Sequence, residues 1–263
     1  MTPGLPRVPL RIGTWNVEYA HPKRLEALRQ RLARHDADIW VLTETHDELA
    51  PSSEHHPVHS APRPKSWRGI REGSRWVTIW SRYPIAPRPI QVGDPERTAC
   101  ALLDLGPGRQ LLVYGTVLPW KGDRAKFDWS EHHRVISEQS AEWRALAAAH
   151  PDTALCVAGD FNTDMTTGGY YGTKVGIAAL RAGLAACGLY CATAASEGSS
   201  GLPCPPIDHI AVPCAWQAST AVVAAWPADR KNLSDHSGLI VQTDGAPERD
   251  PPSRERYPTT SAT

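Results

Sequence analysis

The sequence predicts a chain of the α/β class. Short apolar segments that alternate with polar residues recur along it, and amphipathic segments with helical spacing separate several of them. The first unit is a strand over 10–18, a helix over 23–35 and a strand over 38–45; such strands usually pair in parallel through a right-handed crossover. We expect one domain over 1–243 and a disordered tail over 244–263, which is rich in Pro, Arg, Ser and Thr.

Polar residues stand where the strands of this first unit end. The first strand ends in Asn16 and Glu18, two residues apart, and the second ends at Glu44. Residues two apart share a face of an extended strand, so Asn16 and Glu18 are expected to point the same way.

The densest basic and aromatic stretch of the chain lies at the end of the loop-rich segment 46–74 and runs on to residue 76. A solvated loop and a surface that contacts phosphates and stacks on bases explain it equally well. On the second interpretation Arg68, Arg71 and Trp67 bind substrate. Trp120 and Lys121, which follow a later strand, are further candidates. The other members of the stretch are Arg63, Lys65, Arg75 and Trp76.

The remaining elements follow from the same two periodicities. Helices are expected at 130–149 and 174–188, the second with Gly188 as its cap. The strands expected after the first unit are 76–81, 98–105, 110–117, the beginning of the stretch 154–162, 207–212, 222–226 and 238–241.

The stretch 154–162 begins as a short buried strand and leads into a polar motif. Asp160 and Asn162 lie two apart with Phe161 between them, so the carboxylate and the amide are expected to share a face while Phe161 points into the core. Such a pair can hold a cation, a water or a phosphate. Taken alone, a strand-ending turn explains the motif equally well, because Asp and Asn are common in turns for backbone reasons.

Polar sites at or beside predicted strand ends recur through the whole chain, which favours a shared cleft on one rim of the sheets. Several carboxylates gathered there repel one another, and a divalent cation supplies the missing counter-charge. The donors are oxygens and no cysteine, which indicates Mg²⁺ or Mn²⁺. His236 is a candidate for phosphate contact or proton transfer, with Asp235 to orient it. The sites are Asn16 with Glu18, Glu44, Asp160 with Asn162, Asp208, and Asp235 with His236.

The ordered set of these motifs resembles the endonuclease/exonuclease/phosphatase superfamily, in family order and at family-like separations over about 10–243. The resemblance implies a four-layer α/β sandwich, in which two mixed β-sheets pack face to face with helices outside. It also implies Mg²⁺-dependent hydrolysis of a phosphoester. The motifs are 14–18 (TWNVE), 42–44 (LTE), 79–85 (IWSRYPI), 159–162 (GDFN), 207–210 (IDHI) and 234–237 (SDHS).

Carried over by motif, the resemblance implies a role for each strand-end residue. Glu44 is similar to the principal metal ligand, helped by Asn16, and Glu18 stands where some members carry an acidic residue near the metal. Asp160 resembles the group that orients or deprotonates the attacking water. The remaining roles are phosphate binding by Asn162, support of the metal or of His236 by Asp208 and Asp235, and stabilisation of transition-state charge by His236.

One position departs from the family pattern. Many members carry a His or Tyr that assists the leaving group where this chain has Thr116 or Val117, neither of which is a good acid. The residues that would substitute are Tyr114, Lys121, His132 or His133.

Bulk composition limits the functions that remain. Lys and Arg together number 28, as do Asp and Glu, so the total charge does not indicate a protein that coats nucleic acid. Six cysteines without metal-ligand spacing, no apolar leader and no membrane-length segment lead us to expect a cytoplasmic monomer with free thiols. The basic stretch favours a nuclease acting on DNA or RNA. A phosphatase or phosphodiesterase for a small molecule or lipid headgroup, and an inactive binding module, are the alternatives.

Overall fold

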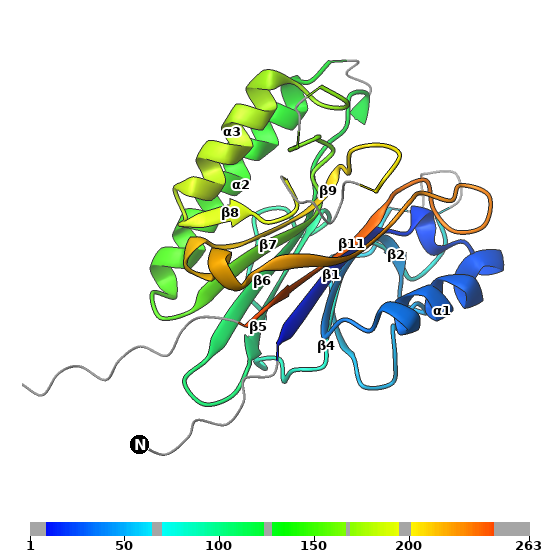
Figure 1. Cartoon of the computed structure of the whole chain (residues 1–263), viewed down its shortest axis with the longest axis horizontal. Helices are drawn as coiled ribbons and strands as arrows, with labels where there is room; N and C mark the ends of the chain where they lie inside the picture. Colours follow the sequence, from blue (N-terminus) through cyan, green and yellow to red (C-terminus); the bar gives the residue numbers. More distant parts are fainter. Residues whose placement is uncertain (1–8, 65–69, 124–127, 167–168, 195–200, 245–263) are drawn as a thin grey trace, which may run out of the picture.

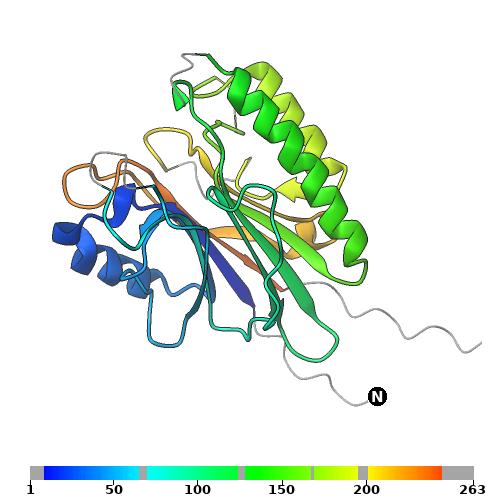
Figure 2. The same ribbon diagram turned by 180° about the vertical axis from the view of Figure 1, so that it is seen from behind.

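Two β-sheets form the centre of the fold, and helices cover their outer faces (Figures 1 and 2). The computed structural model describes all residues except 1–8, 65–69, 124–127, 167–168, 195–200 and 245–263. The tail expected over 244–263 therefore lies outside the described residues from position 245 onward.

The larger sheet has six strands, of which β1 and β2 pair in parallel and the other pairs are antiparallel. The connection from β1 to β2 runs through α1 (Leu25–His35), as the first unit of the sequence predicts. In spatial order the strands are β10 (Ala221–Trp226), β11 (Gly238–Thr243), β1 (Leu10–Asn16), β2 (Ile39–His46), β4 (Ser74–Ser81) and β3 (His56–His59).

The smaller sheet has five strands and is also mixed, because β6 and β7 pair in parallel while their neighbours are antiparallel. Helix α2 (Ser130–Ala149) connects β6 to β7, and α3 (Lys174–Ala185) follows β7. In spatial order the strands are β5 (Thr98–Asp104), β6 (Gln110–Val117), β7 (Ala154–Asp160), β9 (Asp208–Pro213) and β8 (Leu189–Cys191). Short 3₁₀ turns are η1 (Glu18–Ala20), η2 (Pro22–Arg24) and η5 (Cys214–Ser219).

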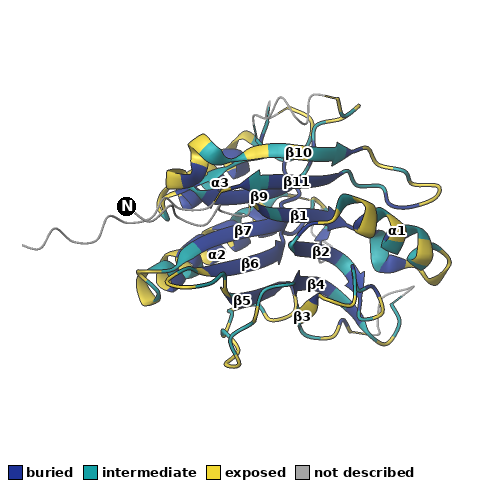
Figure 3. Ribbon diagram, turned by 60° about the horizontal axis from the view of Figure 1, so that its bottom comes forward, coloured by how far each residue is buried: buried dark blue, intermediate teal, exposed yellow. Residues whose placement is uncertain are grey.

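Three apolar clusters separate four layers. One fills the space between the sheets, with Ile12 and Val41 from the larger sheet and Val113 and Ala158 from the smaller. A second joins the larger sheet to α1, and a third joins the smaller sheet to α2 and α3. The order α1, six-stranded sheet, five-stranded sheet, α2 with α3 confirms the predicted four-layer sandwich. In Figure 3 the strands are largely buried and the outer helix faces are exposed.

The period-3.6 pattern of α2 explains how the third cluster forms. Val135, Ile136, Trp143 and Leu146 recur at helical spacing and are all buried against the smaller sheet. Trp143 is fully buried, so its replacement by Ala would cost roughly 3–5 kcal/mol of stability, the usual range for a buried aromatic residue.

The segment 46–74 holds the main differences from the expected elements. It contains β3, which pairs with β4, although four residues that include Pro57 are a weak strand signal. His55 also lies in this segment, where it is buried and its Nε2 lies 3.0 Å from the Ala37 carbonyl oxygen. Among the described residues, no helix is long and apolar enough to cross a membrane.

Candidate active site

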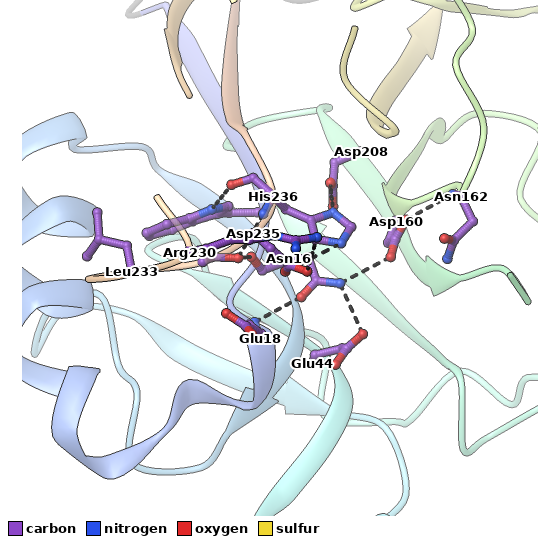
Figure 4. A network of polar contacts seen from close by, with 12 residues as sticks. Asn16, Glu18, Glu44, Asp160, Asn162, Asp208, Arg230, Leu233, Asp235 and His236 are labelled. Atoms are coloured by element: carbon purple, nitrogen blue, oxygen red, sulfur yellow. Dashed lines mark hydrogen bonds and ion pairs between the residues drawn. The ribbon is translucent and has the colours of Figure 1, made fainter. Parts of the chain in front are cut away.

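The polar residues predicted at strand ends do come together, on one rim that the two sheets share (Figure 4). Asn16 ends β1 and Glu44 lies near the end of β2, both in the larger sheet. In the smaller sheet Asp160 ends β7 and Asp208 begins the antiparallel β9, opposite it in register. Asp235 and His236 stand on the segment that enters β11 and complete the group.

Asn16 is the bridge between the two sheets. Its Nδ2 donates to Oε1 of Glu44 at 3.2 Å and to Oδ2 of Asp160 at 3.1 Å, while its Oδ1 accepts the backbone N–H of Glu18 at 2.9 Å. The amide thus presents hydrogen-bond donors to both carboxylates. Because Asn16 is buried, these bonds fix Glu44 and Asp160 relative to each other.

Backbone strain marks the site. Glu44 has φ +46° and Asn162 has φ +47°, in the left-handed region that costs side-chain-bearing residues free energy and recurs at functional sites. Gly159, directly before Asp160, has φ +134°, and a Cβ there would lie 2.1 Å from the carbonyl oxygen of Thr116. Only glycine fits this position, so the geometry that presents Asp160 depends on Gly159.

Asp160 and Asn162 form a turn as well as part of the site. The backbone N–H of Asn162 donates to Oδ1 of Asp160 at 2.9 Å, and Nδ2 of Asn162 donates to the Leu118 carbonyl oxygen at 2.9 Å. Both side chains lie on the rim, while Phe161 between them is fully buried, as predicted. The turn interpretation and the functional one are therefore compatible here.

His236 is held by Asp208. Its Nδ1 lies 2.6 Å from Oδ2 of Asp208, and its Nε2 lies 3.9 Å from Oδ1 of Asp235. Burial alone would lower the pKa of His236, but the carboxylates of Asp208, Asp160 and Asp235 raise it to about 10. The imidazole is thus a cation at neutral pH.

The carboxylates of the site are short of positive charge. Burial, with the negative charge of Asp208, raises the pKa of Asp160 to about 7, and burial raises the pKa of Glu44 and Asp208. Oδ1 of Asp208 is buried and makes no hydrogen bond to any described residue. One ligand atom from each of Asp160, Asp208 and His236 lies within 4.8 Å of the others. An orphaned carboxylate oxygen beside the other carboxylate oxygens of this rim fits a hard divalent cation, which prefers oxygen ligands.

Two predicted metal ligands have other partners. Glu18 lies in η1, where its carboxylate pairs with Nη1 of Arg24 at 2.5 Å, so its charge is already balanced. Asp235 lies 3.6 Å from Nη2 of the exposed Arg230 and remains beside His236.

The predicted substrate-binding residues are spread over several environments. Trp67 and Arg68 lie outside the described residues. Arg71 donates to Oε2 of Glu48 at 2.9 Å and to the Ala20 carbonyl oxygen at 3.1 Å. Lys121 is exposed and Trp120 is half-buried, its ring centroid 6.1 Å from that of Trp76.

Three further residues of the basic stretch are not free to contact phosphates or bases, as the sequence suggested they would be. Trp76 is 3% exposed, so it cannot offer its ring to a base. The stretch also ends in strand β4, where Arg75 makes a two-fold contact with Asp47 at 2.8 Å. Arg63 is buried over the ring of Trp76.

Most of the residues proposed to take the place of the family His or Tyr have hydrogen-bond partners of their own. Tyr114 is fully buried and donates to Oε2 of Glu142 at 2.6 Å, and Thr116 donates to Oε1 of Gln139 at 3.0 Å. Nδ1 of the buried His132 lies 2.6 Å from the Pro119 carbonyl oxygen, and Nε2 of His133 lies 2.7 Å from Oγ1 of Thr173.

Sequence reasoning missed Tyr171. It is half-buried on the loop after β7, its ring packs edge-on against Trp129, and its side chain hydrogen-bonds the backbone of Lys121. Burial, with the negative charge of Asp160, raises the pKa of Tyr171. The residue stands in a glycine-rich loop without regular spacing, so no pattern in the sequence connects it to Asp160.

Comparisons with known proteins bear on the family and on the fold. The model described as Endonuclease/Exonuclease/phosphatase family matches residues 13–236. Curated proteins give no match. Solved structures match at low identity, which shows the fold alone.

Three of these structures illustrate the likeness. A 3′ phosphatase, NExo, from Neisseria bound to a product DNA hairpin has 19% identity and a TM-score of 0.63, over 90% of this chain and 100% of that one. The AP endonuclease LMAP from Leishmania major has 15% identity and a TM-score of 0.64, over 89% and 87%. An AP endonuclease from Archaeoglobus fulgidus has 16% identity and a TM-score of 0.61, over 90% and 100%.

Proposed function

The chain belongs to the endonuclease/exonuclease/phosphatase family, and from this premise we propose that it is a Mg²⁺- or Mn²⁺-dependent nuclease that hydrolyses phosphodiester bonds of DNA or RNA. Family membership supports a phosphoester hydrolase in general terms. The observation that carries the finer proposal is the rim itself, where Asn16 bridges Glu44 to Asp160 and Asp208 holds His236.

Glu44 would hold the cation, and Asn16 would assist it from the same rim, where it contacts both Glu44 and Asp160. Asp235 is a further ligand in this proposal, whereas Glu18 would act at longer range because Arg24 already balances it. When bound, such a cation polarises a phosphoryl oxygen and offsets charge that develops in the transition state. The orphaned Oδ1 of Asp208 and the raised pKa of Asp160 support a cation at this rim.

Asp160 would orient the attacking water and accept its proton. A pKa raised to about 7 suits a group that accepts a proton near neutral pH. Asn162, fixed by its bonds to Asp160 and Leu118, would donate to a phosphate oxygen with its second amide hydrogen. These roles need both side chains on the rim where the turn presents them.

His236 would stabilise negative charge on the phosphoryl group. The imidazolium is kept charged by Asp208, which also fixes the ring through Nδ1 and so leaves Nε2 for the phosphate. Asp235 would contribute to the same field from 3.9 Å. Tyr114, His132 and His133 are engaged in other contacts, so we assign none of them as the acid that assists the leaving group.

A second function also has an observation in its favour. Other side chains of the protein already contact Arg71, Arg75 and Arg63. These contacts weaken the case for a surface at 63–76 that binds a polynucleotide. A small-molecule phosphatase or phosphodiesterase needs no such surface. The nuclease remains first because the similar structures include a phosphatase bound to a DNA hairpin and two AP endonucleases, and because Lys121 is exposed beside the rim.

A substrate panel tests the proposal. The purified protein is incubated with Mg²⁺ and single-stranded DNA, duplex DNA, RNA, inositol phosphates or nucleotides, with D160N as a matched control of the same shape. We expect cleavage of a nucleic acid that D160N slows at least about a hundredfold. Turnover of only small phosphoesters would favour the second function, and no turnover of any substrate would contradict both.

A further inference from the structure

Arg63 is a cation enclosed by aromatic rings. Its side chain is 2% exposed, and its guanidinium carbon lies 3.4 Å from the ring centroid of Trp76 and 4.8 Å from that of Tyr19. A guanidinium over ring faces is stabilised by the ring quadrupoles. Since arginine does not lose its proton in proteins, this charge is permanent.

The anion nearest to this cation belongs to the proposed metal site. Nη1 of Arg63 lies 4.0 Å from Oε2 of Glu44, on the side of the carboxylate opposite the Asn16 bond to Oε1. Nη1 and Nη2 of Arg63 are buried, and neither has a well-aligned hydrogen-bond acceptor among the described residues. The Tyr19 side chain is close by and helps to keep the guanidinium charged. A buried charge with so little hydrogen bonding is costly, so a purely structural stack would be served better by an apolar side chain.

A charge count shows what this arginine does to the rim. With each side chain counted in its ionised form, the partly exposed Glu44 and the buried Asp160 and Asp208 bring three negative charges, and His236, whose Nδ1 contacts Asp208, brings one positive charge. Asp235 and Glu18 are balanced by Arg230 and Arg24. Without Arg63 the rim would carry two negative charges, which a divalent cation would neutralise. With Arg63 the same cation leaves one positive charge, which a phosphodiester anion balances.

We propose that Arg63 is a permanent counter-charge to Glu44 that weakens cation binding and keeps the cation-loaded site positive enough to hold an anionic phosphate. Arg63 is a positioning residue in this role, since it acts through Glu44. The inference rests on the proposed metal-dependent function. It assigns to Arg63 a role other than the direct phosphate contact that the sequence suggested.

The test measures two equilibria that should move in opposite directions. Mn²⁺ binding is followed by electron paramagnetic resonance, and binding of inorganic phosphate to the Mn²⁺-loaded protein is followed by ³¹P relaxation. In R63M we expect Mn²⁺ to bind about tenfold more tightly and phosphate to bind about tenfold more weakly than in the wild type, the scale of one charge at this range in a partly solvated site. R63K, which keeps the charge, should restore both affinities to within about threefold.

R75M is the matched control. Arg75 lies in the neighbouring strand β4 and pairs with Asp47, so its loss changes the net charge equally without removing the cation that faces Glu44. We expect R75M to change both affinities by less than about twofold. Circular dichroism checks the fold, and R63Q replaces R63M should the methionine variant not fold.

The inference would be overturned if folded R63M or R63Q bound Mn²⁺ as tightly as the wild type or more weakly. It would also be overturned if the affinities for Mn²⁺ and phosphate shifted in the same direction. Absence of Mn²⁺ binding by the wild type would instead contradict the metal dependence of the proposed function. The two failures are therefore distinguishable, and neither readout depends on substrate turnover.

Discussion

Asp208 and His236, 28 residues apart in the sequence, are joined by a contact of 2.6 Å between Oδ2 and Nδ1. The contact brings the start of β9 in the smaller sheet to the segment before β11 in the larger one. It sets both the orientation and the charge of the imidazole, because the aspartates around it outweigh the effect of burial on the pKa of His236.

Replacing Asp208 should therefore lower the pKa of His236. In D208N the strongest raising influence is removed, and we expect the pKa of His236 to fall from about 10 by at least about one unit toward its ordinary value of about 6.5. An NMR titration of the histidine ring in the metal-free protein measures this. D235N, at 3.9 Å from Nε2, is the control and should cause a smaller fall. An unchanged His236 pKa in D208N would show that the pair does not hold the charge.

The stabilisation conferred by a cation should grow with pH. Burial and Asp208 raise the pKa of Asp160 from its ordinary value near 3.8 to about 7, so between those pH values the metal-free folded state binds more protons than the unfolded state. The contribution of Asp160 to the free energy of unfolding therefore falls as the pH rises. A cation that binds only the ionised carboxylate of Asp160 offsets this loss. We expect the rise in melting temperature on adding Mn²⁺ to be larger at pH 8 than at pH 5. Comparing each pH with its own chelator control cancels the other titrating groups. Equal shifts at both pH values would argue against an Asp160 that ionises on cation binding.

Gly159 should resist even the smallest side chain. A Cβ there would meet the Thr116 carbonyl oxygen at 2.1 Å, and φ is +134°, so we expect G159A to lose roughly 2–4 kcal/mol of stability in urea denaturation. A Cβ at Gly201 would meet no atom of the described residues within 4 Å, so G201A is the control and should lie within about 1 kcal/mol of the wild type. A fully stable G159A would mean that the turn before Asp160 relaxes at little cost.

Lys121 and Arg71 should differ in their effect on nucleic-acid binding. Arg71 already contacts Glu48 and Ala20, whereas Lys121 is exposed beside the rim. Because each phosphate contact releases counterions, K121A should weaken DNA binding and flatten its salt dependence by about one unit of slope, and R71A should change the slope much less. Salt titrations in an E44Q background, which prevents cleavage, measure both. Should R71A flatten the slope as much as K121A, the internal contacts of Arg71 must give way to substrate.

The strand-end residues could be predicted because their signal is local. Period-two apolar segments place Asn16, Glu44 and Asp160 at strand termini, and the packing of two sheets then gathers those termini on one rim. His209 directly follows Asp208 in a strand, so it faces the other way, and it is buried, with Nδ1 2.8 Å from Oγ1 of Thr193. Strand alternation alone carries that inference.

The electrostatic partners could not be predicted, because they depend on tertiary contacts between distant segments. Arg63 stacks on Tyr19 from η1 and on Trp76 from β4, and no sequence spacing links these three residues. A density of arginines in a loop-rich segment indicated solvent exposure, yet Arg63 is buried and Arg75 lies in a strand. Composition reports which charges are present, while the packing of separate segments decides which of them remain free.

The most direct test of the account is hydrolysis of a DNA phosphodiester by the wild type and by E44Q, each with Mg²⁺ and with excess chelator. Gln keeps the shape of Glu44 and its contact with Asn16 but removes the charge that would hold the cation. We predict Mg²⁺-dependent hydrolysis by the wild type, none by E44Q, and the same circular dichroism for both. Full wild-type hydrolysis in excess chelator, or a wild-type rate for E44Q, would contradict the central claim.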